Sequence, residues 1–459
     1  MTRGLVALAL LLAGCRSSGP PYSPAQALQT FRLHPDYRIE LFAAEPLVSS
    51  PVAIEFDEYG RVYVVENPGY PLDTSRTGRV KLLSDSNGDG RPDRASVFAG
   101  NLMMPTGVMR WKKGILVTDA PDLLYFEDTD NDGRADIRRV VLTGFAFTNP
   151  QHTVNNPVYG LDNWIHIAHE NPTTAVIFRQ FADRGGDIRF PDRPDAPVLK
   201  ARGRSIRFRP GTFQIEARSG TSQFGHAFDD FGRYFTMNNS NHQRHEVIAA
   251  RYLNRNPDLP VAAALEDFSD HGAGAEVYPI TRNPRFEMLT EAGTMTSACG
   301  MTLFHGASFI AEPVHNLVHR DLWSQRGATF TARRADGRAE FLASTDAWFR
   351  PVNFYAGPDG ALYLVDYYRL SIEHPEWTST HTHTSPDLYK GQDLGRIWRI
   401  VPASGVPLPR AIRQGDAAVD ELVSHLSSPH SWWRRNAQRL LVDRPSDAAA
   451  QALERLADD

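Results

Sequence analysis

Residues 80–93, VKLLSDSNGDGRPD, recur in altered form as residues 123–136, LLYFEDTDNDGRAD. In each copy an apolar, strand-like segment runs into an Asp- and Gly-rich turn, and the two turns begin 43 residues apart, at Asp85 and Asp128. A four-stranded blade of a β-propeller takes about 40–45 residues. The repeat therefore predicts consecutive propeller blades.

A second repeated unit joins two short apolar strands through a turn that contains Gly, whose positive φ suits a hairpin. It reads FDEYGRVYV at residues 56–64, and related units occur at 111–117, 159–165, 228–235, 301–321 and 357–365. Six such units predict an all-β, six-bladed β-propeller over residues 36–402. A β-sandwich would explain the strands but not their spacing.

Beyond Pro402 the apolar residues follow a helical period. Val419, Leu422, Val423 and Leu426 recur at intervals of three and four residues, which is typical of an amphipathic helix. We predict a short HEAT-like helical appendage over residues 415–459. Because repeats of this kind need three or more units to be stable alone, we expect either that the helices pack on the propeller or that the chain has been cut short.

The N-terminus reads as a lipoprotein signal peptide over residues 1–14. Arg3 precedes an apolar run at residues 5–12, which is shorter than the about 20 residues of a membrane-spanning helix and ends in Leu-Ala-Gly before Cys15. We expect cleavage before Cys15 and lipidation there, and an incidental cysteine in an ordinary secretory signal is the alternative. Residues 15–35 are predicted to be a flexible tether. These features predict an exported, membrane-anchored lipoprotein of the outer membrane, periplasm or cell surface.

Composition narrows the classes of function. The 459 residues carry a net charge of -5, and the absence of a basic excess argues against nucleic acid as a partner. Cys299 is the only cysteine besides Cys15, so the core rather than disulfides must hold the fold. No CxxCH motif occurs, so we expect no covalently attached haem.

The two Asp-rich turns have the ligand spacing of a calcium loop, with oxygen-bearing side chains at positions 1, 3, 5 and 9 and Gly at position 6. The candidate Ca²⁺ ligands are Asp85, Asn87, Asp89 and Asp93 in the first turn, and Asp128, Asp130, Asp132 and Asp136 in the second. Position 12, which is Glu in an EF-hand, is Ser96 or Arg139. Tight turns closed by Asp side chains, without an ion, are the alternative.

Histidines are candidates for chemistry, because imidazole can accept a hydroxyl proton near neutral pH. His152 lies in a polar, Asn-rich segment, TNPQHTVNN at residues 148–156, just before a predicted strand. Three local sets suggest a metal instead, but none contains a complete ligand set. These sets are His242 and His245 with Glu246, His315 with His319, and His381 with His383.

Residues 37–401 resemble the N-terminal propeller of exported dehydrogenase-like proteins of planctomycetes and verrucomicrobia, which are related to the soluble quinoprotein glucose and sorbosone dehydrogenases. The resemblance rests on both Asp-rich turns and on further motifs. These are TSACG at 296–300, EPVHNLVHR at 312–320, WFRPV at 348–352, GPDGALY at 357–363, IEHP at 372–375 and GRIWRI at 395–400.

This resemblance implies pyrroloquinoline quinone (PQQ) as cofactor, with the base that takes the proton of a sugar hydroxyl at His152. The cofactor-binding positions would be Gln151, where the relatives carry Asp, together with Arg320 and Arg350. An Arg-Asn pair of the relatives has no match at Thr221-Ser222. Relatives of this kind commonly continue into a haem domain that accepts electrons.

The sequence thus predicts a dehydrogenase that oxidises a carbohydrate or polyol in the propeller funnel. It would pass electrons to a separate acceptor, such as a cytochrome c or a quinone, at a membrane reached through the lipid anchor. A non-enzymatic surface propeller that binds glycans or partner proteins is the alternative, and a glycan-cleaving enzyme is a third.

Overall fold

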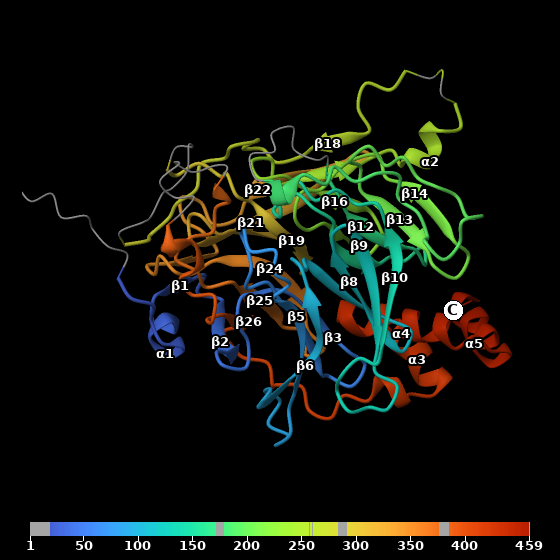
Figure 1. Cartoon of the computed structure of the whole chain (residues 1–459), viewed down its shortest axis with the longest axis horizontal. Coiled ribbons are helices and arrows are strands. Elements are labelled where there is room, and N and C mark those ends of the chain that lie inside the picture. Colours follow the sequence, from blue (N-terminus) through green and yellow to red (C-terminus); the bar gives the residue numbers. More distant parts are fainter. Residues whose placement is uncertain are drawn as a thin grey trace, which may run out of the picture.

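The computed structural model describes residues 19–170, 179–256, 258, 260–282, 292–375 and 385–458. Its strands form six antiparallel sheets arranged around one axis (Figure 1). Each repeated hairpin unit of the sequence lies in a different sheet. The predicted six-bladed β-propeller is therefore confirmed.

Blades 1 to 4 are meanders of four consecutive strands, and the first strand of each blade lies innermost. Blade 1 comprises β3 (Pro51–Phe56), β4 (Val62–Glu66), β5 (Gly78–Ser84) and β6 (Arg94–Leu102). Blade 2 comprises β7 (Gly107–Trp111), β8 (Gly114–Asp119), β9 (Asp122–Glu127) and β10 (Ile137–Thr143). Blade 3 comprises β11 (Asn155–Tyr159), β12 (Ile165–Ala168), β13 (Ile206–Arg209) and β14 (Gln214–Ala217). Blade 4 comprises β15 (Ala227–Phe228), β16 (Tyr234–Thr236), β17 (Arg244–Glu246) and β18 (Leu265–Asp267).

The N-terminal strands close the ring. Blade 5 contains β19 (Cys299–Phe304), β20 (Ala307–Glu312), β21 (Leu317–Arg326), β22 (Thr329–Arg334) and β23 (Leu342–Ser344), and it gains β1 (Phe31–Leu33) at its edge. Blade 6 contains β24 (Pro351–Ala356), β25 (Leu362–Asp366) and β26 (Arg396–Pro402), with β2 (Tyr37–Ala44) paired to β26. Pairing strands from both ends of the propeller segment leaves few open strand edges.

The predicted tether over residues 15–35 is wrong for its second half. Residues Pro24–Leu28 form helix α1, which Ser23 caps, and β1 pairs with β23. Ala27 is buried against blades 5 and 6, so burial of apolar surface holds this segment on the propeller. The signal peptide and Cys15 lie outside the described residues.

The repeated Asp-containing turns join the first two strands of their blades. In blade 1, Asp57 accepts hydrogen bonds from the backbone N–H groups of Tyr59 and Arg61 and pairs with the Arg61 guanidinium at 2.7 Å. Asp229 and Arg233 repeat this arrangement in blade 4. The motif therefore encodes a turn, because the carboxylate satisfies the backbone donors of a tight loop.

Helices α3 (Val419–His425), α4 (Ser431–Asp443) and α5 (Asp447–Asp458) pack together at one side of the strands (Figure 1). Trp432 of α4 joins the apolar core of blades 1 and 6, and the indole of Trp433 donates to the Pro358 carbonyl at 2.7 Å. The expectation that the appendage packs on the propeller is confirmed. Smaller helical segments are α2 (Ala250–Leu253), η1 (Arg179–Phe181), η4 (Pro386–Tyr389) and η5 (Gln414–Asp416).

Candidate functional site

A cavity of about 410 Å³ opens at the end of the central channel where the innermost strands begin. All six blades contribute to its lining through residues at or just before those strands, namely Val52, Thr106, His152, Phe224, Cys299 and Val352. Ligand sites of proteins commonly enclose about 300–1,000 Å³. We call this cavity the funnel.

Close packing around the axis separates the funnel from the rest of the channel. A side chain on Gly107 would place its Cβ 2.6 Å from the backbone nitrogen of Asn156, so only Gly lets β7 and β11 approach this closely. The Asn353 amide donates to the Asn156 side-chain oxygen at 3.1 Å. This packing gives the funnel a floor.

His152 lines the funnel, as the sequence places it. Its Nδ1 lies 2.6 Å from a carboxylate oxygen of Glu170, and the two side chains are 13% and 22% exposed. A carboxylate that accepts from Nδ1–H fixes the tautomer and leaves Nε2 able to accept a proton. The pair is therefore arranged as a general base with its positioning residue.

Glu170 was not predicted from the sequence. It follows β12, whereas His152 precedes β11, and these two strands pair with each other. Both residues therefore lie at the same end of one hairpin. The signal that would have found Glu170 is a carboxylate directly after the second strand of the blade that contains His152.

The funnel also contains a buried acceptor without a partner among the described residues. The Oδ1 atom of Asn67 is buried and accepts no hydrogen bond within that part of the chain. Its backbone carbonyl accepts from the Tyr367 hydroxyl at 2.7 Å. Because an unsatisfied buried acceptor costs about 1–3 kcal/mol, this oxygen is suited to a ligand hydroxyl.

Gln151 also reaches the funnel, but it contacts protein. Its amide donates to the Tyr70 hydroxyl at 2.8 Å, and Tyr70 donates to the Ile372 carbonyl at 2.7 Å. Burial raises the pKa of Tyr70 well above its usual value, so the hydroxyl stays protonated as a donor. This chain of hydrogen bonds shapes the wall beside His152.

Arg320 does not reach the funnel. It lies on β21, the third strand of its blade, and its guanidinium binds the Asp336 carboxylate through two hydrogen bonds at 3.1 and 2.7 Å. It also stacks over Phe341. The structure therefore gives Arg320 a role within blade 5 and does not place it where a funnel ligand could bind.

Arg350 is buried behind the funnel wall. Its guanidinium donates to the backbone carbonyls of Pro313, Arg369 and Leu370 at 2.8, 3.0 and 2.6 Å. Pro313 itself lines the funnel. Arg350 thus holds together the loops that form the wall, and the structure does not bring it to the cavity together with His152.

The described lining does not fit PQQ, an ortho-quinone that carries three carboxylates. Carboxylates buried in a site require cationic or multiple N–H partners. No Lys or Arg occurs among the described residues that line the funnel, and Glu373 adds a carboxylate there. The lining instead offers amide, hydroxyl and aromatic groups, which suit a neutral, hydroxyl-rich ligand.

The Asp-rich turns lie away from the funnel, in the β5–β6 and β9–β10 hairpins. Carboxylates of Asp128, Asp130 and Asp136 come within 4.8 Å of one another, whereas the carboxylates of Asp85, Asp89 and Asp93 form no such group, and Asn87 accepts from the backbone of Asp89. Asp132 accepts only from the backbone of Arg134 among the described residues.

Every one of these side chains closes its own turn. Asp85 accepts from the N–H groups of Gly88 and Gly90, and Asp128 accepts from Asn131 and Gly133. Asp93 and Asp136 each accept from the backbone and hydroxyl of the residue after the first Asp. These contacts match Asp-closed turns and are compatible with Ca²⁺ at the second one.

A second cavity, of about 630 Å³, lies at the opposite end of the channel under helix α4. Arg110 and Arg439 line it, and both bind the Glu58 carboxylate, at 2.7 and 2.9 Å. Burial raises the pKa of Glu55 in this cavity to about 7. Because α4 covers this end and Arg110 and Arg439 are paired with Glu58 there, we place the candidate site in the funnel.

These features define the class of protein: a six-bladed propeller with a ligand-sized funnel and a His–Glu pair in its wall. The chain belongs to the family described as a domain of unknown function, DUF7133, whose model matches residues 23–404. No curated protein matches the chain in sequence.

Solved structures of similar fold cover nearly the same part of the chain. The PQQ-bound aldose sugar dehydrogenase of Streptomyces coelicolor is 12% identical, with a TM-score of 0.41 over 81% of this chain and 100% of that chain. The PQQ domain of pyranose dehydrogenase from Coprinopsis cinerea is 12% identical, with a TM-score of 0.43 over 81% and 96%. A luciferin-regenerating enzyme is 9% identical, with a TM-score of 0.45 over 82% and 99%. At these TM-scores, activity has to be argued from the site.

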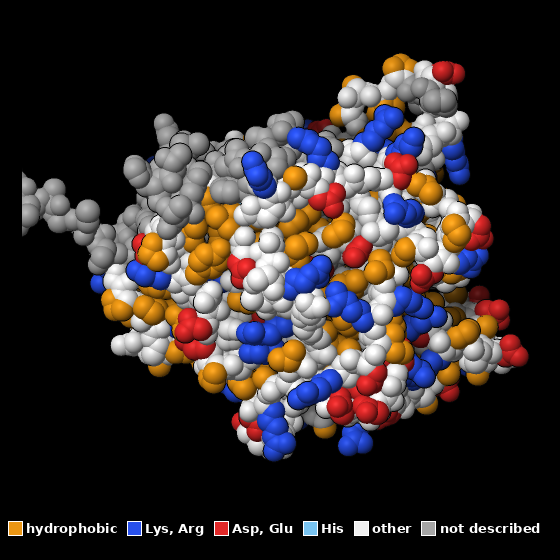
Figure 2. Space-filling model, viewed as in Figure 1, with side chains coloured by type: hydrophobic (Ala, Val, Ile, Leu, Met, Phe, Trp, Pro, Cys, Tyr) orange, Lys and Arg blue, Asp and Glu red, His pale blue; other side chains and the backbone are white. Residues whose placement is uncertain are grey.

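The surface adds little to the choice of ligand. On the face in Figure 2, Lys and Arg side chains are interspersed with Asp and Glu rather than gathered in one patch. Within the described residues, no helix has the length and apolarity needed to cross a membrane. Cys299, which borders the funnel, is a free cysteine, and burial raises the pKa of its thiol well above the usual value.

Proposed function

We propose that the funnel binds a neutral sugar or polyol and that the chain oxidises it, with His152 taking the hydroxyl proton. The observation that carries this proposal is that His152, which lines a cavity formed by all six blades, is held at its Nδ1 by Glu170 at 2.6 Å. Oxidation of an alcohol removes a proton from oxygen and a hydride from carbon. His152 accounts for the proton, and an added two-electron acceptor takes the hydride.

The groups around His152 support a neutral ligand. The Oδ1 atom of Asn67, which accepts no hydrogen bond among the described residues, would accept a ligand hydroxyl, and Glu170 holds Nδ1 of the His152 imidazole. Because the described lining has no cation, a sugar acid or phosphorylated sugar is a poorer ligand than the neutral compound.

The cellular setting is part of the same proposal. A lipid on Cys15 would hold the propeller at a membrane outside the cytoplasm, where carbohydrates and a separate acceptor, such as a cytochrome c or a quinone, are available. Ca²⁺ at the turn that contains Asp128 would stabilise blade 2 rather than take part in the reaction.

The test is dye-linked oxidation of a panel of neutral sugars and polyols by the chain without its signal peptide. Each assay is run with and without PQQ and Ca²⁺, and His34→Ala, outside the funnel, is the control for His152→Ala. We expect turnover with at least one neutral compound and its loss in His152→Ala alone. Failure of every compound to reduce the dye would overturn the proposal.

A glycan-binding propeller without catalysis is the second candidate, and the lack of a described cation for PQQ favours it. Binding of the same panel, followed by calorimetry, separates the two functions. Binding without dye reduction under any condition supports this second candidate.

A further inference from the structure

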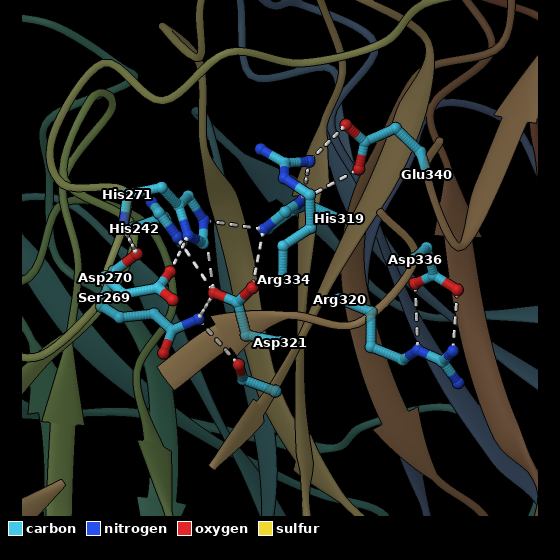
Figure 3. A network of polar contacts seen from close by, with 12 residues as sticks. His242, Ser269, Asp270, His271, His319, Arg320, Asp321, Arg334, Asp336 and Glu340 are labelled. Atoms are coloured by element: carbon cyan, nitrogen blue, oxygen red, sulfur yellow. Dashed lines mark hydrogen bonds and ion pairs between the residues drawn. The ribbon is translucent and has the colours of Figure 1, made fainter. Parts of the chain in front are cut away.

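Three histidines and one aspartate from distant parts of the sequence meet between blades 4 and 5. His242 precedes β17 and His271 follows β18 in blade 4, whereas His319 and Asp321 lie two residues apart on β21 of blade 5. Figure 3 shows the three imidazoles turned toward the Asp321 carboxylate. None of these four residues lines the funnel.

One possible ligand atom from each of these four residues lies within 4.8 Å of the other three, which is close enough for a single metal ion. Nε2 of His319 lies 3.1 Å from Oδ1 of Asp321 and 3.2 Å from Nε2 of His271. Oδ2 of Asp321 lies 3.3 Å from Nε2 of His242 and 3.6 Å from Nε2 of His271. Ligand bonds of about 2.0–2.1 Å to a tetrahedral Zn²⁺ place neighbouring ligand atoms about 3.3 Å apart.

Outer carboxylates orient two of the imidazoles. Nδ1 of His319 lies 2.8 Å from Glu340, and Nδ1 of His271 lies 2.7 Å from Asp270. Such contacts are typical of metal-binding histidines, because they fix the proton on the remote nitrogen. The lone pairs of the two Nε2 atoms then face each other, which is unfavourable unless a cation lies between them.

Burial and charge favour a cation at this position. The side chains of His242, His319 and Asp321 are fully buried, and that of His271 is 17% exposed at the edge. The buried carboxylates of Asp321 and Glu340 adjoin the imidazoles, whereas Asp270 is 57% exposed. Among the described residues, one guanidinium contacts this group, that of Arg334, which binds Glu340 at 3.1 Å. Buried negative charge requires compensation.

We propose that His242, His271, His319 and Asp321 bind one divalent transition-metal ion of the Zn²⁺ class, which links blade 4 to blade 5. Three imidazole nitrogens suit Zn²⁺ rather than Ca²⁺ or Mg²⁺, which prefer oxygen. Four protein ligands close the coordination sphere, so the ion is structural. The site is independent of the chemistry proposed for the funnel.

A network without metal is the rival explanation. If His319 were protonated on both nitrogens, it would donate to Asp321 or His271 through Nε2 and to Glu340 through Nδ1. The contacts would then be hydrogen bonds of an imidazolium ion. The two explanations differ in whether the protein takes up one equivalent of metal.

The experiment uses the full chain without its signal peptide. Metal content is measured by plasma mass spectrometry, the metal is removed with a chelator, and the apoprotein is titrated with Co²⁺ alone. We expect one metal ion per chain, visible absorption bands of tetrahedral Co²⁺, and a lower melting temperature for the apoprotein. Metal content well below one per chain, no such bands and chelator-insensitive melting would overturn the proposal in favour of the imidazolium network.

Variants locate the ion. His271→Gln changes the partly exposed ligand and should weaken Co²⁺ binding by more than the roughly 10- to 100-fold typical of losing an outer partner. His245→Gln is the matched control, since His245 is buried in the same blade but contacts Thr329 instead. Equal Co²⁺ affinity in the wild type and His271→Gln would contradict the assignment. If a variant fails to fold, the Co²⁺ titration of the wild-type apoprotein still tests the proposal.

Discussion

The two ends of the propeller channel are built from different kinds of sequence. At the α4 end, the repeated Asp-containing turns pack against the C-terminal helices, and paired charges such as Glu58 with Arg110 and Arg439 hold that contact. At the funnel end, each blade contributes a different loop, and one of them places His152 against Glu170. The repeated motifs therefore form the scaffold, and the loops that do not repeat form the candidate site.

Among changes to residues that support His152, Glu170→Gln should have the largest effect and should act on turnover alone. In Glu170→Gln the amide cannot hold His152 as the carboxylate does, so we expect turnover of a neutral sugar to fall about 100-fold or more. Stopped-time dye assays measure this loss. Thermal unfolding should be unchanged, and a variant as active as the wild type would remove Glu170 from the site.

Acid should weaken the α4 end of the propeller. Burial alone would raise the pKa of Glu58. The hydrogen bonds and charges of Arg110 and Arg439 outweigh burial and lower this pKa to about 2. The unfolded state then binds more protons below about pH 4.5, so the free energy of unfolding falls by about 3 kcal/mol between pH 4.5 and 2. Burial raises the pKa of Glu55 to about 7. The folded state therefore binds more protons above about pH 4.5, and there the free energy of unfolding falls as the pH rises.

Urea unfolding at several pH values tests this slope. Glu58→Gln should flatten the pH dependence of the free energy of unfolding below pH 4.5 and leave the dependence above pH 4.5 unchanged. An unchanged acid slope in the variant would assign the effect to other carboxylates.

Loss of one cation at the α4 end should destabilise the protein without affecting the funnel. Arg439→Met removes a buried partner of Glu58 while Arg110 remains, so we expect a loss of about 2 kcal/mol in the free energy of unfolding. Arg455→Met is the control, because that side chain is 67% exposed. Reduced turnover at a temperature where the variant is fully folded would contradict the separation of the two ends.

The smallest effect is expected at the funnel acceptor. Asn67→Ala removes the buried Oδ1 that a ligand hydroxyl would meet, so affinity for a neutral sugar should fall about fivefold, equivalent to about 1 kcal/mol. Calorimetric titration measures this change. An unchanged affinity would place the ligand elsewhere in the funnel.

The fold could be predicted from the sequence because its signals are local. The hairpin turns at Asp57 and Asp229 are each encoded within five residues. The spacing of the repeated hairpin units along the chain gives the number of blades. Closure of blade 5 by β1 was missed, since a three-residue strand carries too little pattern to distinguish it from a tether.

The site could be predicted only in part. His152 and Gln151 reach the funnel, but the partners that define them, Glu170 and Tyr70, come from other loops. Arg320 and Arg350 carry the right charge for an anionic cofactor, yet both bind groups within the protein. Sequence position alone could not show which side of a blade each guanidinium faces.

The cluster of His242, His271, His319 and Asp321 was missed for a related reason. His242 and His319 were each grouped with histidines close in sequence, but their partners lie on neighbouring blades. The spacing of His319 and Asp321 was the one local signal, because residues two apart on a strand point to the same face.

The central claim is that His152 acts as the base toward a neutral ligand in the funnel. Chemical rescue of His152→Ala by added imidazole tests it most directly, with dye reduction as the readout and calorimetry to confirm that the sugar still binds. We predict that the variant binds the sugar, turns it over about 100- to 10,000-fold more slowly, and regains activity as imidazole is added. Wild-type turnover in the variant without imidazole would contradict the account.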